Sequence, residues 1–179
     1  MPELQTNGLS FEKVWASLQE LAERQKKTDQ QIGRLGNRFG ELAEHLVAPG
    51  IVDKFNALGF QFSDISRDHE IKDPATGKSL AEVDIILENG DIVIAVEVKS
   101  KLKDQDVDKH LTRMDVLRRR ADRRGDRRRY RGAMAAAIVT EATRSYAAKA
   151  GFYLLEQSGD TMKLAMPEGF VPREWIASF

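Results

Sequence analysis

Residues 4–35 carry hydrophobic side chains in a seven-residue repeat, separated mostly by charged and amide side chains. The two positions of the repeat hold Leu4, Phe11, Leu18, Gln25 and Ile32, and Val14, Leu21, Thr28 and Leu35. Such a narrow stripe is typical of a coiled coil, so we expect residues 1–36 to form a helix that joins copies of the chain into a homo-oligomer. A helix folded back on its own domain is the alternative, although such a helix usually has a wider stripe.

The remainder of the chain, residues 37–179, alternates between helical and strand-like patterns. Helical spacing recurs over residues 39–47, 51–58, 104–120 and 141–150. Short hydrophobic runs predict strands at GFQFSDI, AEVDIILE, DIVIAVEVK, AMAAAIVT, FYLLE and TMKLAM. The order of a helix, three strands, a helix, a strand, a helix and further strands predicts a mixed α/β domain.

The dipeptide Asn89-Gly90 separates two of these strands and is a strong signal for a β-hairpin. With a two-residue turn at this dipeptide, we expect Ile85 to lie opposite Ile94 and Asp84 opposite Ala95. Side chains then alternate between two faces of the hairpin. The face expected to pack on the core carries Val83, Ile85, Leu87, Ile92, Ile94, Val96 and Val98.

The other face of the hairpin carries a polar patch at its open end, formed by Glu82, Asp84, Glu97 and Lys99. Neighbouring carboxylates repel each other, and a divalent cation bridging Asp84 and Glu97 would relieve the repulsion. Mg²⁺ (or Mn²⁺) suits such a patch, because Mg²⁺ is usually held by one or two carboxylates together with waters and phosphate oxygens. The structural alternative is an exposed salt-bridge cluster that contributes roughly 0 to 1 kcal/mol.

Composition narrows the classes of protein to consider. Hydrophobic residues make up 41% and charged residues 31% of the 179 residues, as in a globular protein with a charged surface. The chain has no cysteine, which excludes disulfides and thiolate metal sites and fits the cytoplasm. No hydrophobic run approaches the roughly 20 residues of a membrane helix, and the N-terminal residues lack the pattern of a signal peptide, so we expect no membrane association.

The net charge of zero hides an uneven distribution. Acidic residues outnumber basic ones over residues 41–100, and basic residues dominate residues 101–131. The arginines expected to bind nucleic acid phosphates are Arg113, Arg118, Arg119, Arg120, Arg123, Arg124, Arg127, Arg128 and Arg129. A solvated helix end and loop without a ligand is the alternative. The three histidines, His45, His69 and His110, have no metal-ligand spacing and are expected to be ordinary surface or core residues.

Asp84, followed on the next strand by Glu97-Val98-Lys99, resembles the signature of the PD-(D/E)XK nuclease superfamily. The superfamily's first motif commonly has Pro-Asp where this chain has Glu82-Val83-Asp84. The order of coiled coil, glycine break, helix and hairpin is also similar to that in a bacterial family of uncharacterised proteins.

This resemblance implies a restriction endonuclease-like fold and a role for each matching residue. Asp84, Glu97 and the carbonyl of Val98 would bind Mg²⁺, and Lys99 would assist the attacking water. A helix glutamate often joins the metal shell in this superfamily, and the segment GNRFGELAEHLV assigns that role to Glu41, with Glu44 as the weaker candidate.

Two functions of different classes follow. The first is a metal-dependent nuclease that hydrolyses phosphodiester bonds in DNA. The second is a catalytically inactive, oligomeric coiled-coil module that binds nucleic acid or a protein partner. The intact set of Asp84, Glu97 and Lys99 favours the nuclease.

Overall fold

The computed structural model describes residues 12–13, 15–17, 20, 49–159 and 161–178. Its centre is a six-stranded sheet with the strands in sequence order. The strands are β1 (Asp64–Lys72), β2 (Ser79–Glu88), β3 (Ile92–Lys101), β4 (Arg129–Ile138), β5 (Tyr153–Ser158) and β6 (Thr161–Leu164). Neighbouring strands are antiparallel except β3 with β4 and β4 with β5, which are parallel. This mixed sheet with its flanking helices confirms the predicted α/β class.

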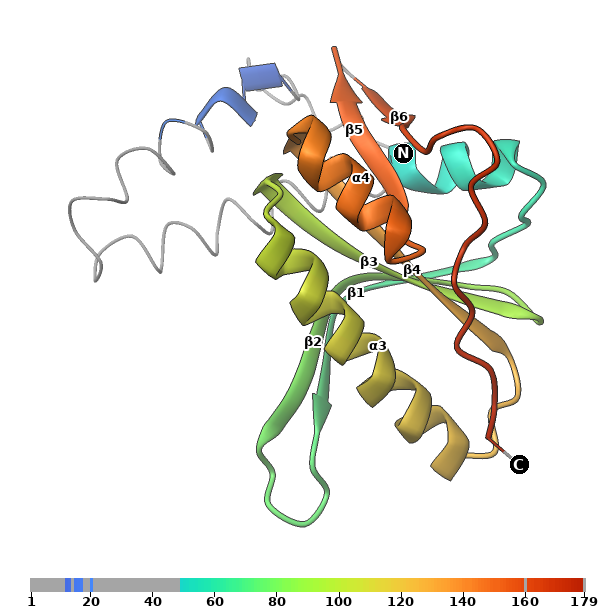
Figure 1. The fold of residues 1–179 in the computed structure, drawn as a ribbon. Coiled ribbons are helices and arrows are strands. Elements are labelled where there is room, and N and C mark those ends of the chain that lie inside the picture. Colours follow the sequence, from blue (N-terminus) through green and yellow to red (C-terminus); the bar gives the residue numbers. More distant parts are fainter. Residues whose placement is uncertain (1–11, 14, 18–19, 21–48, 160, 179) are drawn as a thin grey trace, which may run out of the picture.

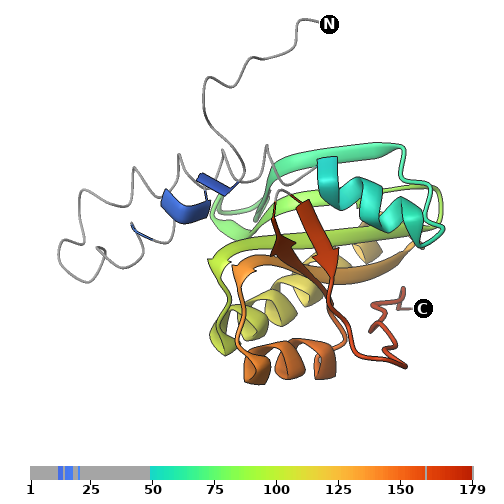
Figure 2. The same ribbon diagram turned by 90° about the horizontal axis from the view of Figure 1, so that it is seen from above.

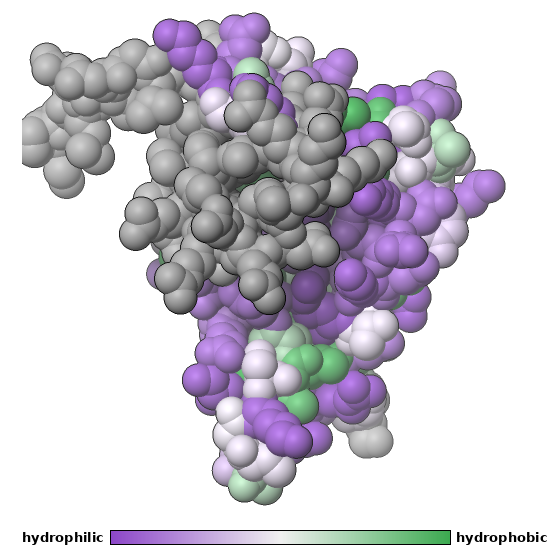
Figure 3. Space-filling view, turned by 90° about the vertical axis from the view of Figure 1, so that its left-hand side faces the viewer, coloured by the Kyte–Doolittle hydropathy of each residue, from purple (hydrophilic) through white to green (hydrophobic). Residues whose placement is uncertain are grey.

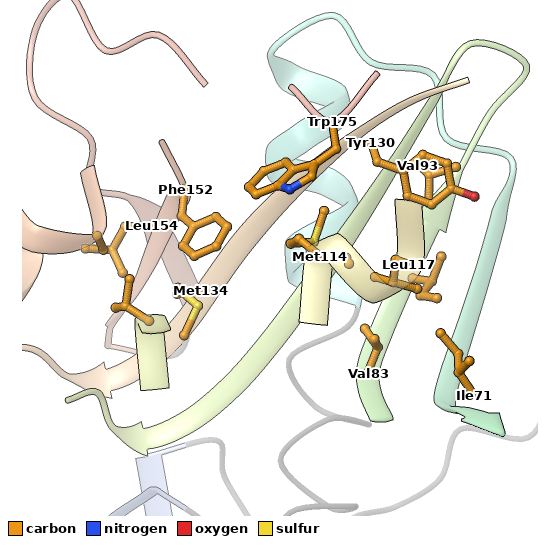
Figure 4. Close-up of a cluster of buried hydrophobic side chains, with 14 of the residues drawn as sticks. Ile71, Val83, Val93, Met114, Leu117, Tyr130, Met134, Phe152, Leu154 and Trp175 are labelled. Atoms are coloured by element: carbon orange, nitrogen blue, oxygen red, sulfur yellow. The ribbon is translucent and has the colours of Figure 1, made fainter. Parts of the chain in front are cut away.

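Helices cover both faces of the sheet (Figures 1 and 2). Helices α3 (Asp104–Arg123) and α4 (Glu141–Lys149) lie on one face, because each forms the crossover between two parallel strands. A helix over residues 49–57 lies on the opposite face. Two hydrophobic clusters fill the two interfaces, one beneath α3 and α4 (Figure 4) and one that contains Ile51 and Phe55.

The predicted order of elements is confirmed from residue 49 onward, and the main difference concerns β1. The strand expected at GFQFSDI begins only at Asp64 and continues to Lys72 through a polar stretch. Phe60 and Phe62, placed in that strand by their alternation, instead stack on each other at 5.3 Å beside Phe55. Because β1 is an edge strand and is largely exposed, its sequence lacks the hydrophobic alternation that would have identified it.

The predicted register of the β2–β3 hairpin is wrong by two residues. Ile85 lies opposite Val96, not Ile94, and Ile86 lies opposite Ala95. The turn is longer than two residues because the side chain of Asn89 accepts hydrogen bonds from the backbone N–H groups of Asp91 and Ile92, both at 2.9 Å. A shift of two residues preserves the faces, so Ile85, Leu87, Ile94 and Val96 still share one cluster.

One residue of the predicted core face departs from this arrangement. The β2–β3 ladder ends at Ile85, and Val83 beyond it packs in the cluster beneath α3, beside Ile71 and Leu117 (Figure 4). Near the turn, both faces of the hairpin are hydrophobic, because one cluster contains Ile86 and Val93 and the other contains Leu87 and Ile94. The polar residues of the hairpin lie at its open end.

Trp15 is buried at 2% exposure in the cluster that contains Ile51 and Phe55. Residues 15–17 are helical. The seam residues of the predicted coiled coil, together with Glu41, Glu44 and His45, lie outside the described residues. The coiled coil, the oligomer and the boundary at residue 36 therefore stay predictions, and the burial of Trp15 is an observation in favour of the alternative in which this segment packs on its own domain.

The C-terminal segment returns to the start of β4 (Figure 1). Tyr130 and Trp175 exchange two backbone hydrogen bonds, and the indole N–H of Trp175 donates to Asp115 of α3 at 2.8 Å. Hydrophilic side chains dominate the described part of the face seen in Figure 3. None of the helices in the described part of the chain is long and hydrophobic enough to span a membrane.

Candidate active site

Asp84 and Glu97 come together where β2 leaves β3. Beyond the last ladder pair, the backbone N–H of Val98 donates to Oδ2 of Asp84 at 2.7 Å, so a side chain replaces the neighbouring strand's carbonyl. Among the described residues, Oδ1 of Asp84 accepts no hydrogen bond. Because N–H and C=O of a strand residue point to the same edge, the carbonyl of Val98 is directed to the side on which Asp84 lies.

Glu97 is 5% exposed and forms ion pairs with two positively charged side chains, one at each carboxylate oxygen. Oε1 lies 2.9 Å from Nζ of Lys99, and Oε2 accepts from Nη1 of Arg113 at 2.8 Å. The Lys99 side chain is 37% exposed, whereas that of Arg113 is 18% exposed. Lys99 can thus contact solvent or a substrate, and Arg113 mainly fixes Glu97.

A buried histidine holds Arg113 in place. His110 is fully buried, and its Nε2 lies 3.0 Å from the carbonyl oxygen of Ala95 in β3. Its Nδ1 lies 3.2 Å from Nη1 of Arg113. These partners assign the proton to Nε2, which donates to Ala95, and leave Nδ1 to accept from Arg113. Burial lowers the pKa of His110 to about 4, so the ring is neutral, as this arrangement requires.

The charges of the site influence one another. Burial, reinforced by the Glu97 carboxylate, raises the pKa of Asp84 to about 7. Burial also disfavours the ammonium of Lys99, but the adjacent Glu97 outweighs this and raises the pKa of Lys99. The cluster is therefore a pair of close carboxylates beside a lysine that stays charged.

The donor set fits a hard divalent cation. Asp84 and Glu97 offer carboxylate oxygens from neighbouring strands, and Val98 offers a carbonyl on the same side. Within the described ranges, no third acidic or histidine side chain completes a group of three. Two carboxylates with waters and phosphate oxygens are nevertheless the usual environment of Mg²⁺, and each Glu97 oxygen keeps a second lone pair. Glu82, the extra carboxylate of the motif, is exposed and lies opposite Glu70 of β1.

The arginines predicted to bind phosphate fall into two groups in the structure. One group is engaged within the chain. Arg113 binds Glu97, and Arg118 is 5% exposed with its guanidinium bound to the carbonyl oxygens of Asp126 and Arg128. Arg128 pairs with Asp126 at 2.7 Å, and Arg129 pairs with Glu174 at 3.4 Å.

The other group is exposed. Arg119, Arg123, Arg124 and Arg127 are exposed and have no ion-pair partner among the described residues. Arg120 is half-buried and donates from Nη1 to Nε2 of His69 at 2.8 Å. The sequence pattern does not separate these two groups of arginines, and it does not reveal the contact between His110 and Arg113. Val107, His110 and Met114 have the spacing of one side of a helix. This spacing is the sequence signal from which the burial of His110 in α3 could have been predicted.

No protein-family model matches the chain, and no curated protein matches it. Solved structures of endonucleases do resemble it. A repair endonuclease from Pyrococcus abyssi has 19% sequence identity over 62% of this chain, with a TM-score of 0.44. The small subunit of the heterodimeric restriction endonuclease R.BspD6I has 11% identity over 81% of this chain and 72% of its own, with a TM-score of 0.39.

A complex of EndoMS with dsDNA has 12% identity over 63% of this chain, with a TM-score of 0.34. The chain spans only 45% of the Pyrococcus abyssi enzyme and 45% of EndoMS.

Proposed function

We propose that the chain is a metal-dependent nuclease that hydrolyses phosphodiester bonds in DNA. The observation that carries the proposal is the meeting of Asp84 and Glu97 at the divergence of β2 and β3, with Lys99 in contact with Glu97. An ordinary surface ion-pair cluster would not need a glutamate that is 5% exposed between two cations. Buried carboxylates held close together where two strands separate are instead typical of functional sites, and a bound cation would relieve their repulsion.

Each residue of the site has a separate role in this proposal. Asp84, Glu97 and the carbonyl of Val98 would hold Mg²⁺ or Mn²⁺. When bound, such an ion polarises a phosphate oxygen and lowers the pKa of a coordinated water. Lys99 is charged and partly exposed, so its ammonium can orient a water or stabilise the negative charge that develops on the phosphate. Arg113 keeps the Glu97 carboxylate in one orientation.

Exposed arginines supply the surface for the polynucleotide. Arg119, Arg123, Arg124 and Arg127 lie at the C-terminal end of α3 and in the loop after it. They have no acidic partner among the described residues, so their charge is available to phosphates. Binding through these side chains would be independent of sequence, because phosphate contacts carry no base information.

Cleavage assays with matched acidic variants test the proposal. Purified full-length protein is incubated with linear, branched and single-stranded DNA and with Mg²⁺ or Mn²⁺. We expect cleavage by the wild type and at least a ~100-fold loss in Asp84→Asn and Glu97→Gln, since even partners outside the first coordination shell affect metal sites by 10- to 100-fold. Asp91→Asn, a neutralised exposed aspartate in the same hairpin turn, serves as the matched control and should cleave normally.

Two results would contradict the proposal. Wild-type protein that cleaves none of these substrates with either ion would favour the inactive binding module. Cleavage that survives in both Asp84→Asn and Glu97→Gln would assign the activity to another site or to a contaminant.

A further inference from the structure

A small pocket lies between α3 and the first strands of the sheet, apart from the carboxylate pair. Its volume is about 100 Å³, and its polar lining comes from His69, Glu88, Arg120, Arg124, Asp126 and Arg128. Ile86, Val93 and Leu117 contribute hydrophobic walls. Pockets for drug-sized ligands begin at roughly 300 Å³, so this one has room for a small group only.

The charges around the pocket favour an anion. Arg128 forms ion pairs with both acids, with Asp126 at 2.7 Å and with Glu88 at 3.3 Å, and the three arginines of the pocket outnumber its two acids. Arg120 contacts only the imidazole of His69, and Arg124 has no partner among the described residues. Within the described residues, the guanidinium groups of Arg120 and Arg124 therefore form no ion pair, and the pocket carries a surplus of one positive charge.

The imidazole of His69 stands at a distortion of β1. The preceding residue, Asp68, has a φ of 51°, in the left-handed region that non-glycine residues seldom adopt. No ladder pair forms at Asp68, although the register is the same on both sides of it, at the pairs Arg67–Ile85 and His69–Val83. Strained backbone of this kind persists only where the surrounding structure enforces it, and it often occurs at functional sites. Here it accompanies a ring that contacts Arg120.

The pocket adjoins the candidate active site. Ile86 lies two residues from Asp84 along β2, about 7 Å at the rise of a strand. Arg120 lies seven residues after Arg113 on α3, about 10 Å along the same side of the helix. A chain of phosphates bound at Asp84 and Glu97 could thus extend to the pocket along α3.

We propose that the pocket formed by His69, Arg120 and Arg124 binds one phosphate group of the polynucleotide, next to the phosphate that is cleaved. This inference rests on the proposed function for its ligand and deepens it. Guanidinium groups suit the pocket's role because they bind phosphate oxygens with paired N–H groups. The group is either a terminal phosphate or an internal phosphodiester, which share this chemistry.

Titration of the full chain with inorganic phosphate tests the pocket without metal or cleavage. The chain has three histidines, so the His69→Gln variant assigns the imidazole NMR signals of His69. We expect phosphate to shift these signals with saturation. Arg120→Gln should weaken phosphate binding about tenfold, the effect of losing one charge-assisted contact. Lys109→Gln removes one positive charge from an exposed position of the same helix and should leave phosphate binding unchanged.

Oligonucleotides distinguish the two sources of the phosphate. Binding of 5′-phosphorylated, 3′-phosphorylated and unphosphorylated strands is measured on Asp84→Asn protein, with and without Arg120→Gln. A terminal site predicts that an end phosphate strengthens binding and that Arg120→Gln removes this gain. An internal site predicts that Arg120→Gln weakens all three strands equally and by more than Arg119→Gln does.

The proposal is overturned if phosphate leaves the His69 signals unchanged, or if Arg120→Gln and Lys109→Gln affect phosphate binding equally. Either outcome can occur while the cleavage assays succeed, because the phosphate titration uses neither metal nor the carboxylate pair. Failure of the cleavage assays with a normal phosphate titration would instead leave an anion site on a protein that is not a nuclease.

Discussion

Oδ2 of Asp84 accepts a hydrogen bond of 2.7 Å from the backbone N–H of Val98. The contact lies just beyond the last backbone pair between β2 and β3, where β2 turns away with β1. A carboxylate thus ties the two strands together at the point where their ladder ends. It also brings Asp84 beside the strand that carries Glu97 and Lys99, so the divergence of the strands creates the candidate site.

Replacing Lys99 should reduce cleavage without removing the metal ligands. Lys99→Ala is expected to lower the single-turnover rate by about 100- to 1,000-fold, the usual effect of losing one group that stabilises transition-state charge. Lys99→Arg should restore little, because a planar guanidinium does not occupy the position of an ammonium. Rates at saturating DNA and a full Mg²⁺ titration are the measurement. A simple increase in the Mg²⁺ requirement would show that Lys99 acts on metal binding instead.

Arg113 should affect the rate of cleavage and not the affinity for DNA. Its guanidinium binds Glu97 and His110 and is 18% exposed, so it has little contact with solvent. We expect Arg113→Gln to lower kcat by about tenfold or more, since Glu97 loses an orienting partner. Arg119→Gln is the matched charge change on the same helix and should leave kcat unchanged. Equal losses of DNA affinity in the two variants would indicate that Arg113 belongs to the DNA-binding surface.

Alanine variants of Arg118 and Arg119 should have different effects, one on the stability of the fold and the other on DNA binding. Arg118→Ala leaves the carbonyl oxygens of Asp126 and Arg128 without a partner, and should lower the free energy of unfolding by about 3 kcal/mol. Arg119→Ala should change that free energy by less than about 0.5 kcal/mol but should weaken DNA binding and reduce its salt dependence by about one unit of slope. Urea unfolding and anisotropy titrations at several salt concentrations measure both. If Arg118→Ala instead weakened DNA binding and left the free energy of unfolding unchanged, Arg118 would be a DNA contact.

Asp126 should stabilise the fold in a pH-dependent way. Hydrogen bonds from Arg128, together with that from Tyr130, lower the pKa of this carboxyl to about 2, despite its partial burial. Because the folded-state pKa is depressed, the stabilisation is complete above the unfolded value of about 3.9 and is lost as the pH falls through about 2. Asp126→Asn should therefore cost about 1 to 2 kcal/mol at neutral pH. Urea unfolding at neutral and acid pH should show this difference shrinking below about pH 4.

The N-terminal repeat yields a prediction about assembly. Residues 1–36 are expected to join copies of the chain through Leu4, Phe11, Val14, Leu18, Leu21, Ile32 and Leu35. Multi-angle light scattering of the full chain should give a mass above 20.2 kDa per particle. A monomer at tens of micromolar would mean that the segment packs on its own domain, as Trp15 does.

Sequence alone determined the order of the elements from residue 49 onward and the faces of the hairpin near its turn. Both follow from local rules. Periodicity distinguishes helix from strand, and alternation along a strand gives the face of each residue even when the register is shifted by two. The motif Glu97-Val98-Lys99 could be found for the same reason, since its spacing is local.

Tertiary structure decided which partner each of these residues has. The side chain of Asn89 lengthened the turn and moved the register, and the arginines of α3 were divided by what lies opposite each of them. Arg113, Arg118 and Arg119 are alike in the sequence, but one meets Glu97 of β3, one meets the carbonyls of the following loop, and one meets solvent. Charges at similar positions of one helix acquire different environments only when distant elements pack against them, and periodicity carries no information about those contacts.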